Sequence, residues 1–301
     1  MKAAADAYVA LRRVAGFALS NTEYLLHSFA RFAHDRHEAH IRTASVIAWA
    51  SQGPSLAQRH RRYETVRQFA VDAQLDDPRH DSPPPGYFGY RKTRRPPRLY
   101  TPTEIDQLVA AATRLPPPDA LRPQTYAALI SLLAATGLRI AEALALTLAD
   151  LTPDGLLIRK TKFQKTRLVP LHETAIAGLG EYLRHRHRRA LGGDRVFVSD
   201  RGRPLPYQTV HGVFRTLVRA TRLPSIGGRA PSLHGLRHTF AVRALVTSPT
   251  GRQQVGQAMR ALATYLGHVS IVSTYWYLEA TPDLLTDVAA ASDRWIGGGQ
   301  P

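Results

Sequence analysis

A basic, proline-rich segment divides this chain of 301 residues and limits how it can fold more than any other feature. Residues 79–98 read RHDSPPPGYFGYRKTRRPPR, in which five prolines and two glycines oppose regular secondary structure. The chain is also long enough for two domains. We therefore predict an N-terminal domain over residues 1–78, a linker over 79–98 and a second domain over 99–301.

The N-terminal domain is expected to be entirely helical. Apolar residues recur at helical spacing after Asn21, a candidate N-cap, and after Thr43, which could cap a short segment; a further helix is expected to begin at Ser55. The helix after Ser55 has an apolar stripe and an arginine-rich remainder. Its other faces carry arginines that are either ordinary solvated residues or, as a group, a surface that binds a polyanion. These arginines are Arg59, Arg61, Arg62 and Arg67.

The second domain is expected to be mainly α with a small β-sheet, an α+β arrangement. It opens with the string TPTE, in which Thr101 and Glu104 form a capping box around a proline at the first helical position. Residues 156–171 alternate as a β-hairpin with its tip near 162–165, and RVFVS at 195–199 predicts another short strand. Helices are expected up to about Leu148 and again from about Tyr207.

The charge balance indicates a polyanionic partner. The formal net charge is +17 and the sequence pI is about 10.7. Arginine dominates lysine, which coding bias in a GC-rich genome would explain, but such bias does not explain the overall excess of positive charge. The cationic linker could cross a phosphate backbone or act only as a self-repelling spacer.

Composition also excludes several classes of protein. The chain has no cysteine, so disulfides, thiolate metal sites and cysteine nucleophiles are excluded. No apolar run reaches the ~20 residues of a membrane span, and the N-terminus does not have the pattern of a signal peptide. We expect a soluble cytoplasmic protein that makes no membrane contact.

Two short motifs each pair a cationic group with a second polar residue three positions away. In TGLRIAEAL, Arg139 could hold a phosphate oxygen while Glu142 orients its guanidinium group. In LHGLRHTFA, Arg237 offers a second guanidinium group, and His234 could take a proton or bind the phosphate. By itself the first motif could equally be a surface ion pair, which contributes little. His238, one residue beyond Arg237, points about 100° away around a helix.

A third motif, LGHVSIVSTYWYL, contains His268 and Tyr277. Tyr275 competes with Tyr277 as a nucleophile, but on a helix the two side chains point about 200° apart. A buried aromatic cluster is the alternative reading of such a string.

Lysine is rare in this chain, yet three of its five lysines lie within six residues at the expected hairpin tip: Lys160, Lys162 and Lys165. Lysine can give up a proton at accessible pH and arginine cannot, so lysine can serve as a general acid. An ordinary basic turn is the other interpretation of this cluster.

From about Leu99 to Asp283, these strings resemble the signature boxes of the tyrosine recombinases, or phage integrase family. The resemblance implies a helical core-binding domain followed by a catalytic domain. It also implies that Arg139, Arg237 and His268 neutralise charge on a pentavalent phosphate, with Glu142 orienting Arg139. The spacing of nine residues after His268 matches the family's nucleophile and favours Tyr277 over Tyr275.

The remaining chemical roles follow from the same resemblance. Tyr277 attacks the phosphodiester, His234 removes or shares its proton, and a hairpin lysine, which aligns with Lys162, protonates the departing 5′ oxygen. The product is a 3′-phosphotyrosyl link that conserves bond energy, so no ATP, metal or other cofactor is expected.

The partners that the resemblance implies are double-stranded DNA with specific recombination sites and other copies of the chain. We expect a tetramer in the synaptic complex, a monomer or dimer off DNA, and association with the nucleoid. Integration, excision or transposition of a mobile element is the expected role. A type IB topoisomerase-like nicking and relaxing enzyme and a catalytically silent DNA-binding regulator are the alternatives.

Overall fold

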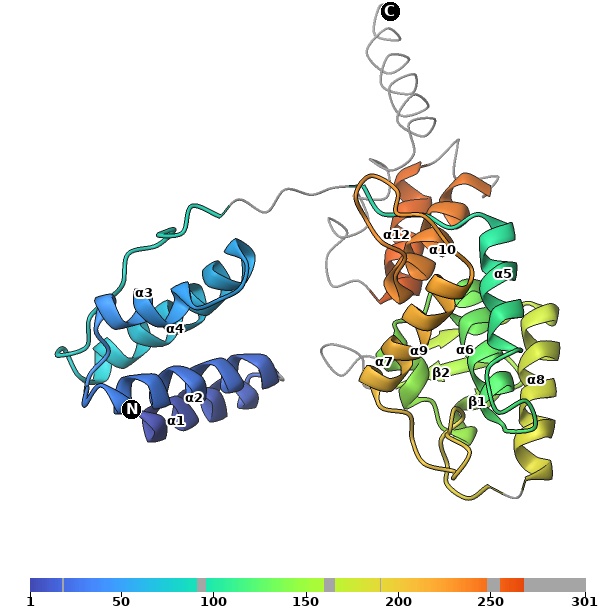
Figure 1. Ribbon diagram of the computed structural model, residues 1–301, viewed down its shortest axis with the longest axis horizontal. Helices are drawn as coiled ribbons and strands as arrows, with labels where there is room; N and C mark the ends of the chain where they lie inside the picture. The colour runs from blue at the N-terminus through green and yellow to red at the C-terminus, as the bar shows by residue number, and fades with distance from the viewer. Residues whose placement is uncertain (18, 91–95, 160–165, 190, 248–254, 268–301) are drawn as a thin grey trace, which may run out of the picture. The chain divides into compact units, whose positions relative to one another are not determined.

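A computed structural model describes residues 1–17, 19–90, 96–159, 166–189, 191–247 and 255–267. The chain forms two compact units, Met1–Arg94 and Arg95–Pro301, and each is considered by itself (Figure 1). Both are rich in helix, and the second contains a small sheet. The prediction of a mainly α protein with a small β-sheet is confirmed.

The first unit is helical, as the sequence predicts. Its helices are α1 (Lys2–Val14), α2 (Ser20–Asp35), α3 (Thr43–Ser51) and α4 (Leu56–Asp76). Aromatic and aliphatic side chains from all of them form one core, in which Phe29 packs edge-on against Trp49 and Tyr8 against Phe69. In this part of the chain, the apolar stripes that define the helices are also the surfaces that join them.

The helix caps of this unit only partly follow the local sequence. The helix expected from Ser55 is present as α4, and Ser55 caps it by accepting a hydrogen bond from the backbone N–H of Gln58. Two predicted caps are wrong: Asn21 lies inside α2, and Thr43 is the first residue of α3. The backbone N–H of Thr43 is instead bound by the carboxylate of Asp81, which comes from much later in the chain and which local sequence could not reveal.

The segment expected to be a linker contributes to both units. Asp81 binds the start of α3, and the hydroxyl of Tyr63 donates to the carbonyl of Pro84, so these residues pack on the first unit. At the other end, Arg98 is buried in the second unit, where it forms a bidentate ion pair with Glu104. Arg98 therefore has a structural role, as the buried partner of Glu104.

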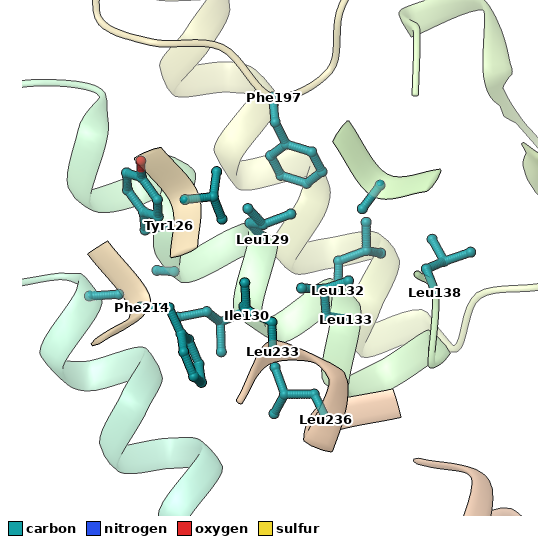
Figure 2. Close-up of a cluster of buried hydrophobic side chains, with 14 of the residues drawn as sticks. Tyr126, Leu129, Ile130, Leu132, Leu133, Leu138, Phe197, Phe214, Leu233 and Leu236 are labelled. Carbon is teal, nitrogen blue, oxygen red and sulfur yellow. The ribbon is translucent and has the colours of Figure 1, made fainter. Parts of the chain in front are cut away.

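The second unit is built around α6 (Arg122–Thr136), which is buried along most of its length. It is surrounded by α5 (Pro102–Ala112), α8 (Glu173–Arg188) and α10 (Leu233–Thr247), with α7 (Ile140–Ala145), α9 (Tyr207–Ala220) and α12 (Val255–Leu266) completing the described helices. Figure 2 shows Leu129, Ile130 and Leu133 of α6 packed against neighbours that include Phe214 and Leu236. The predicted capping box at Thr101 and Glu104 is confirmed at the start of α5.

The sheet is antiparallel in the order β1-β2-β3 and contributes Leu156, Ile158 and Val169 to the same core as α6. Its strands are β1 (Leu151–Thr152), β2 (Gly155–Ile158) and β3 (Arg167–Val169), so the strands of the predicted hairpin are confirmed. A short 3₁₀ helix, Leu148–Asp150, precedes β1. The predicted strand at 195–199 is wrong: its apolar residues are buried, but they make only isolated bridges at Arg195 and Val198.

Helix α10 lies very close to the start of the second unit. The backbone N–H of Tyr100 donates to the hydroxyl of Thr239, and the Tyr100 hydroxyl donates to the carbonyl of Ser232. A side chain on Gly235 would have its Cβ 2.7 Å from the Tyr100 ring. The glycine in LHGLRHTFA therefore allows α10 to pack here.

A second glycine sets the course of the chain before Arg139. Gly137 ends α6 in a left-handed conformation with φ of 61°, and a Cβ there would lie 2.4 Å from Cδ1 of Phe240 on α10. Phe240 stacks in turn on Tyr265 of α12. A side chain at 137 would therefore press on Phe240 and disturb the packing of α10 against the end of α6.

Replacing Gly137 with alanine should lower the free energy of unfolding by roughly 2–5 kcal/mol. This sum combines about 1–2 kcal/mol for the left-handed backbone with about 1–3 kcal/mol for overpacking. Gly178→Ala is the matched control: it lies within α8 with nothing near its Cβ, and should stabilise by about 0.5–1 kcal/mol. Urea denaturation measures both changes, and a Gly137→Ala variant as stable as the wild type would contradict the packing argument.

Candidate active site

Arg139 is the residue from which α7 begins. The chain leaves α6 at Gly137, buries Leu138, and reaches Arg139 with extended backbone angles, φ −68° and ψ 142°. Arg139 therefore precedes the helix, whereas the sequence analysis placed it within one. This position leaves its side chain 35% exposed and free to contact groups from other elements.

Glu142 binds Arg139 in two ways. One carboxylate oxygen accepts from the backbone N–H of Arg139 at 2.9 Å, and the other accepts from its guanidinium Nη1 at 2.9 Å. The bond from Glu142 to the backbone N–H of Arg139 is one half of a capping box. The reciprocal half cannot form, because an arginine side chain has no hydrogen-bond acceptor. The i,i+3 ion pair predicted from the sequence is present, and it doubles as the N-terminal cap of α7.

A second arginine, Arg167 on β3, also binds Glu142. Its Nη1 and Nη2 lie 3.1 Å and 2.8 Å from the two carboxylate oxygens. Burial opposes ionisation of Glu142, but the hydrogen bonds from Arg167 and Arg139 and their charges outweigh it, so the pKa of Glu142 lies below its usual value. This nearly buried carboxylate is therefore charged and is held by two guanidinium groups.

Arg237 occupies α10 and is among the most buried side chains of the protein, with 2% of the residue exposed. Its Nη1 donates to the carbonyl of Gly137 at 2.8 Å, and its Nη2 donates to the carbonyl of Leu266 at 2.7 Å. These carbonyls lie at the C-terminal ends of α6 and α12, where helix carbonyls lack intrahelical donors and the helix dipole is negative. Arg237 thus joins two helix ends.

Arg139 reaches the same helix end. Its Nη1 and Nη2 each lie 3.3 Å from a carbonyl oxygen, of Leu266 and Gly267 respectively. Because Leu266 accepts from both Arg139 and Arg237, the two guanidinium groups lie close together. The structure therefore brings together two motifs that are about a hundred residues apart in sequence.

Gly267 makes this convergence possible. It ends α12 with φ of 64°, in the left-handed region, and its N–H donates to the carbonyl of Thr264. A Cβ at this position would lie 2.9 Å from Nη1 of Arg167. The residue that follows this turn in sequence is His268.

His234 lies in the first turn of α10, close enough to both arginines to sense their charge. Desolvation by the surrounding protein lowers its pKa, and the positive charges of Arg237 and Arg139 lower it further. The residue nevertheless keeps an exposed surface. At neutral pH its imidazole is therefore uncharged and able to accept a proton.

His238, which the sequence analysis set aside, contacts His234. The two rings meet edge to face with centroids 4.3 Å apart, because residues four apart lie on the same side of a helix. His238 points away from Arg237 but lies one turn after His234, which explains the contact.

Three predicted site residues, Lys162, His268 and Tyr277, lie outside the described residues, as do Lys160, Lys165 and Tyr275. In sequence, the lysines belong to the segment that joins β2 to β3, and His268 directly follows Gly267. Of the predicted set, the structure thus brings together Arg139, Glu142, His234 and Arg237.

Arg167 and Tyr265 are the main site neighbours that the sequence analysis missed. Arg167 shares a face of β3 with the fully buried Val169, while Leu168 between them is exposed. Because side chains alternate between the two faces of a strand, the sequence places Arg167 on the same face as Val169. A charged residue on that inward face was the signal that could have identified Arg167. Tyr265 feels the charges of Arg167 and Arg237, but burial raises its pKa to about 12, so its phenol stays neutral.

This arrangement is suited to binding an anion. Arg139, Arg167 and Arg237 supply three positive charges against the one negative charge of Glu142, and planar guanidinium groups match the geometry of phosphate oxygens. Within the described residues, no three His, Asp or Glu side chains are grouped so that they could hold a metal ion.

Comparison with known proteins identifies the family. The sequence profile of the phage integrase family matches residues 98–283, which is more than half of the chain. The chain belongs to the phage integrase family.

Relatives over nearly the full length agree with this assignment. The integrase/recombinase y4rB of Sinorhizobium fredii is 37% identical over 97% of this chain and 96% of its own length. The tyrosine recombinase XerD of Caulobacter vibrioides is 32% identical over 86% of this chain and 83% of its own. The protein is thus an enzyme of the tyrosine-type site-specific recombinases.

Solved structures share the fold. The Tn1549 transposon integrase in complex with a circular intermediate DNA has a TM-score of 0.67 at 19% identity, covering 97% of this chain and 99% of that one. A lambda integrase dimer bound to a core site has a TM-score of 0.64 at 20% identity, covering 93% and 77%. No described helix of this integrase-family chain is both long and apolar enough to cross a membrane.

The His234 environment yields a titration test. Its imidazole should titrate below 6.5, the ordinary pKa of histidine, and Arg139→Gln should raise that pKa because it removes a nearby positive charge. Arg159→Gln is the control, since Arg159 pairs with Asp150 beside the sheet and does not act on His234. NMR titration of the histidine ring protons measures the shift, and equal values in the wild type and Arg139→Gln would contradict the geometry.

Proposed function

We propose that this enzyme cuts and rejoins double-stranded DNA at specific sites through a 3′-phosphotyrosyl link to Tyr277, in the integration, excision or transposition of a mobile element. The observation that carries the proposal is the shared contact of Arg139 and Arg237 with the carbonyl of Leu266. This carbonyl holds cationic groups from two motifs. In the sequence, Leu266 lies two residues before His268, in the motif that also contains Tyr277.

In the proposed reaction, Arg139 and Arg237 bind the non-bridging oxygens of the scissile phosphate, and His268 adds a further donor. These groups offset the negative charge that builds up on the pentavalent phosphorus, and fixed charges of this kind act most strongly in a site shielded from water. The bound phosphate is also held in line for attack.

Tyr277 then attacks the phosphorus while the bond to the 5′ oxygen breaks. Tyrosine phenols ordinarily have a pKa of about 10, so a tyrosine nucleophile needs a proton acceptor at neutral pH. His234 fits this role because its lowered pKa leaves it uncharged. Lys162 donates a proton to the 5′ oxygen as it leaves. A 5′ hydroxyl from a partner duplex reverses these steps and joins new strands, with no net change in the number of diesters.

The proposed assembly is a tetramer on two DNA duplexes, formed from monomers or dimers off DNA. The helical unit Met1–Arg94 is the proposed core-binding domain, and the unit from Arg95 is the proposed catalytic domain. Support comes from the net charge of +17 and from the lambda integrase dimer on a core site, which shares the fold. Nearly full-length similarity to an integrase/recombinase supports the mobile-element role.

Tyr277→Phe should abolish covalent DNA attachment, because the ring remains while the attacking oxygen is lost. The substrate is a supercoiled plasmid carrying the DNA that flanks the gene, and SDS-resistant protein–DNA complexes are counted on a gel. Tyr275→Phe and Tyr265→Phe are matched controls that make the same change at the competing and the packed tyrosine, and both should keep the covalent complex. A complex that persists in Tyr277→Phe would overturn the nucleophile assignment.

The wild type should recombine paired sites and should not relax plasmids that lack them. Paired plasmids with and without the flanking DNA, analysed for new junctions and for topoisomers, separate the two activities. Equal relaxation of both plasmids without new junctions would favour a topoisomerase of the IB type. Binding without any covalent complex would favour a silent regulator.

A further inference from the structure

Arg167 lies outside the three motifs that carry the proposed chemistry, yet it contacts the elements that position them. It begins β3, directly after the segment that contains the three clustered lysines. Its side chain is only 12% exposed and faces inward with Val169. The end of α12 at Gly267 packs directly against its guanidinium group.

We propose that Arg167 is a positioning residue, which holds and neutralises Glu142 so that the site keeps a net positive charge and Arg139 keeps its orientation toward a bound phosphate. The inference rests on the proposed function for the identity of that phosphate as part of DNA. Phosphate binding would then depend on Arg167 as well, but indirectly, through its contact with Glu142.

Charge balance is the first argument. Arg139 and Glu142 alone form a neutral pair, because the carboxylate lies 2.9 Å from the guanidinium group and is nearly buried. Such a pair would attract an anion weakly. With Arg167 on the same carboxylate, the three groups carry a net charge of +1, and the hydrogen bonds of Glu142 are divided between two cations.

Geometry is the second argument. Arg167 binds both carboxylate oxygens with two different nitrogens, a fork that fixes the plane of the carboxylate. That plane sets where Glu142 can accept from the backbone and side chain of Arg139. Arg167 is itself confined by strand pairing, since it lies opposite Ile158 in the sheet.

Phosphate binding tests the inference without relying on DNA chemistry. Isothermal titration with inorganic phosphate is performed on the wild type, and Arg139→Gln identifies the binding event that belongs to this site. Arg167→Met should weaken that event about tenfold, equivalent to about 1.4 kcal/mol. Glu142→Gln should also weaken it, because the amide no longer holds Arg139 through a charged oxygen, and its affinity is the reference for the double variant.

The double variant Glu142→Gln/Arg167→Met is the decisive arm. If Arg167 acts through Glu142, the double variant should bind phosphate about as well as Glu142→Gln alone, a strongly non-additive result. Arg159→Met, the same change at the residue after β2 that pairs with Asp150, is the matched control and should bind like the wild type. Arg167→Lys should fall between the wild type and Arg167→Met, because lysine keeps the charge but loses the fork.

Additive losses in the double variant would overturn the inference, as would an unchanged phosphate affinity in Arg167→Met. No binding at this site by the wild type would also overturn it. If Arg167→Met does not fold, as judged by circular dichroism, Arg167→Lys and the double variant decide the question in the same way.

The proposed function is judged separately. On the plasmid carrying the flanking DNA, Arg167→Met should lower kcat for covalent complex formation more than it raises KM, because the oriented charge matters most in the transition state. Arg167-dependent phosphate binding by a wild type that never forms a covalent complex would contradict the proposed function and leave the role of Arg167 intact.

Discussion

The arrangement of this site depends on one acceptor, the carbonyl oxygen of Leu266 at the end of α12. It receives hydrogen bonds from Arg139, which precedes α7, and from Arg237 within α10. The last carbonyls of a helix have no intrahelical donors and carry the negative end of the helix dipole, so they attract cations. A main-chain atom thus holds two guanidinium groups together that would otherwise repel each other.

The surrounding structure stabilises this concentration of positive charge. Gly137 contributes a second helix-end carbonyl to Arg237, and Glu142 contributes a carboxylate shared by Arg139 and Arg167. Removing one member of a buried charged cluster leaves the others uncompensated, which costs far more than the intact cluster contributes. The same positive charge makes the site a receptor for a phosphate. Anion binding and local stability are therefore linked here.

Much of the fold could be predicted from the sequence, and the errors have physical causes. The capping box at Thr101 and the start of a helix at Ser55 were predicted correctly, because both depend on interactions within a few residues. The cap expected at Thr43 was wrong, because Asp81 supplies the acceptor from across the first unit. Residues 195–199 have the apolar composition of a strand, but among the described residues they form only isolated bridges. The secondary-structure propensity of a segment does not show which distant residues will pair with it.

The chemical inventory of this protein can be read from its residues alone: the cationic motifs, the i,i+3 pair of Arg139 and Glu142, the absence of cysteine and the excess of positive charge. These follow from residue type and short spacing. It required the folded structure to show that Arg139 and Arg237 share one carbonyl and that Arg167 on β3 binds Glu142 on α7. Those contacts join residues between 25 and 127 positions apart. Packing of the helices around α6 and the left-handed turns at Gly137 and Gly267 create them, and no local pattern encodes that packing.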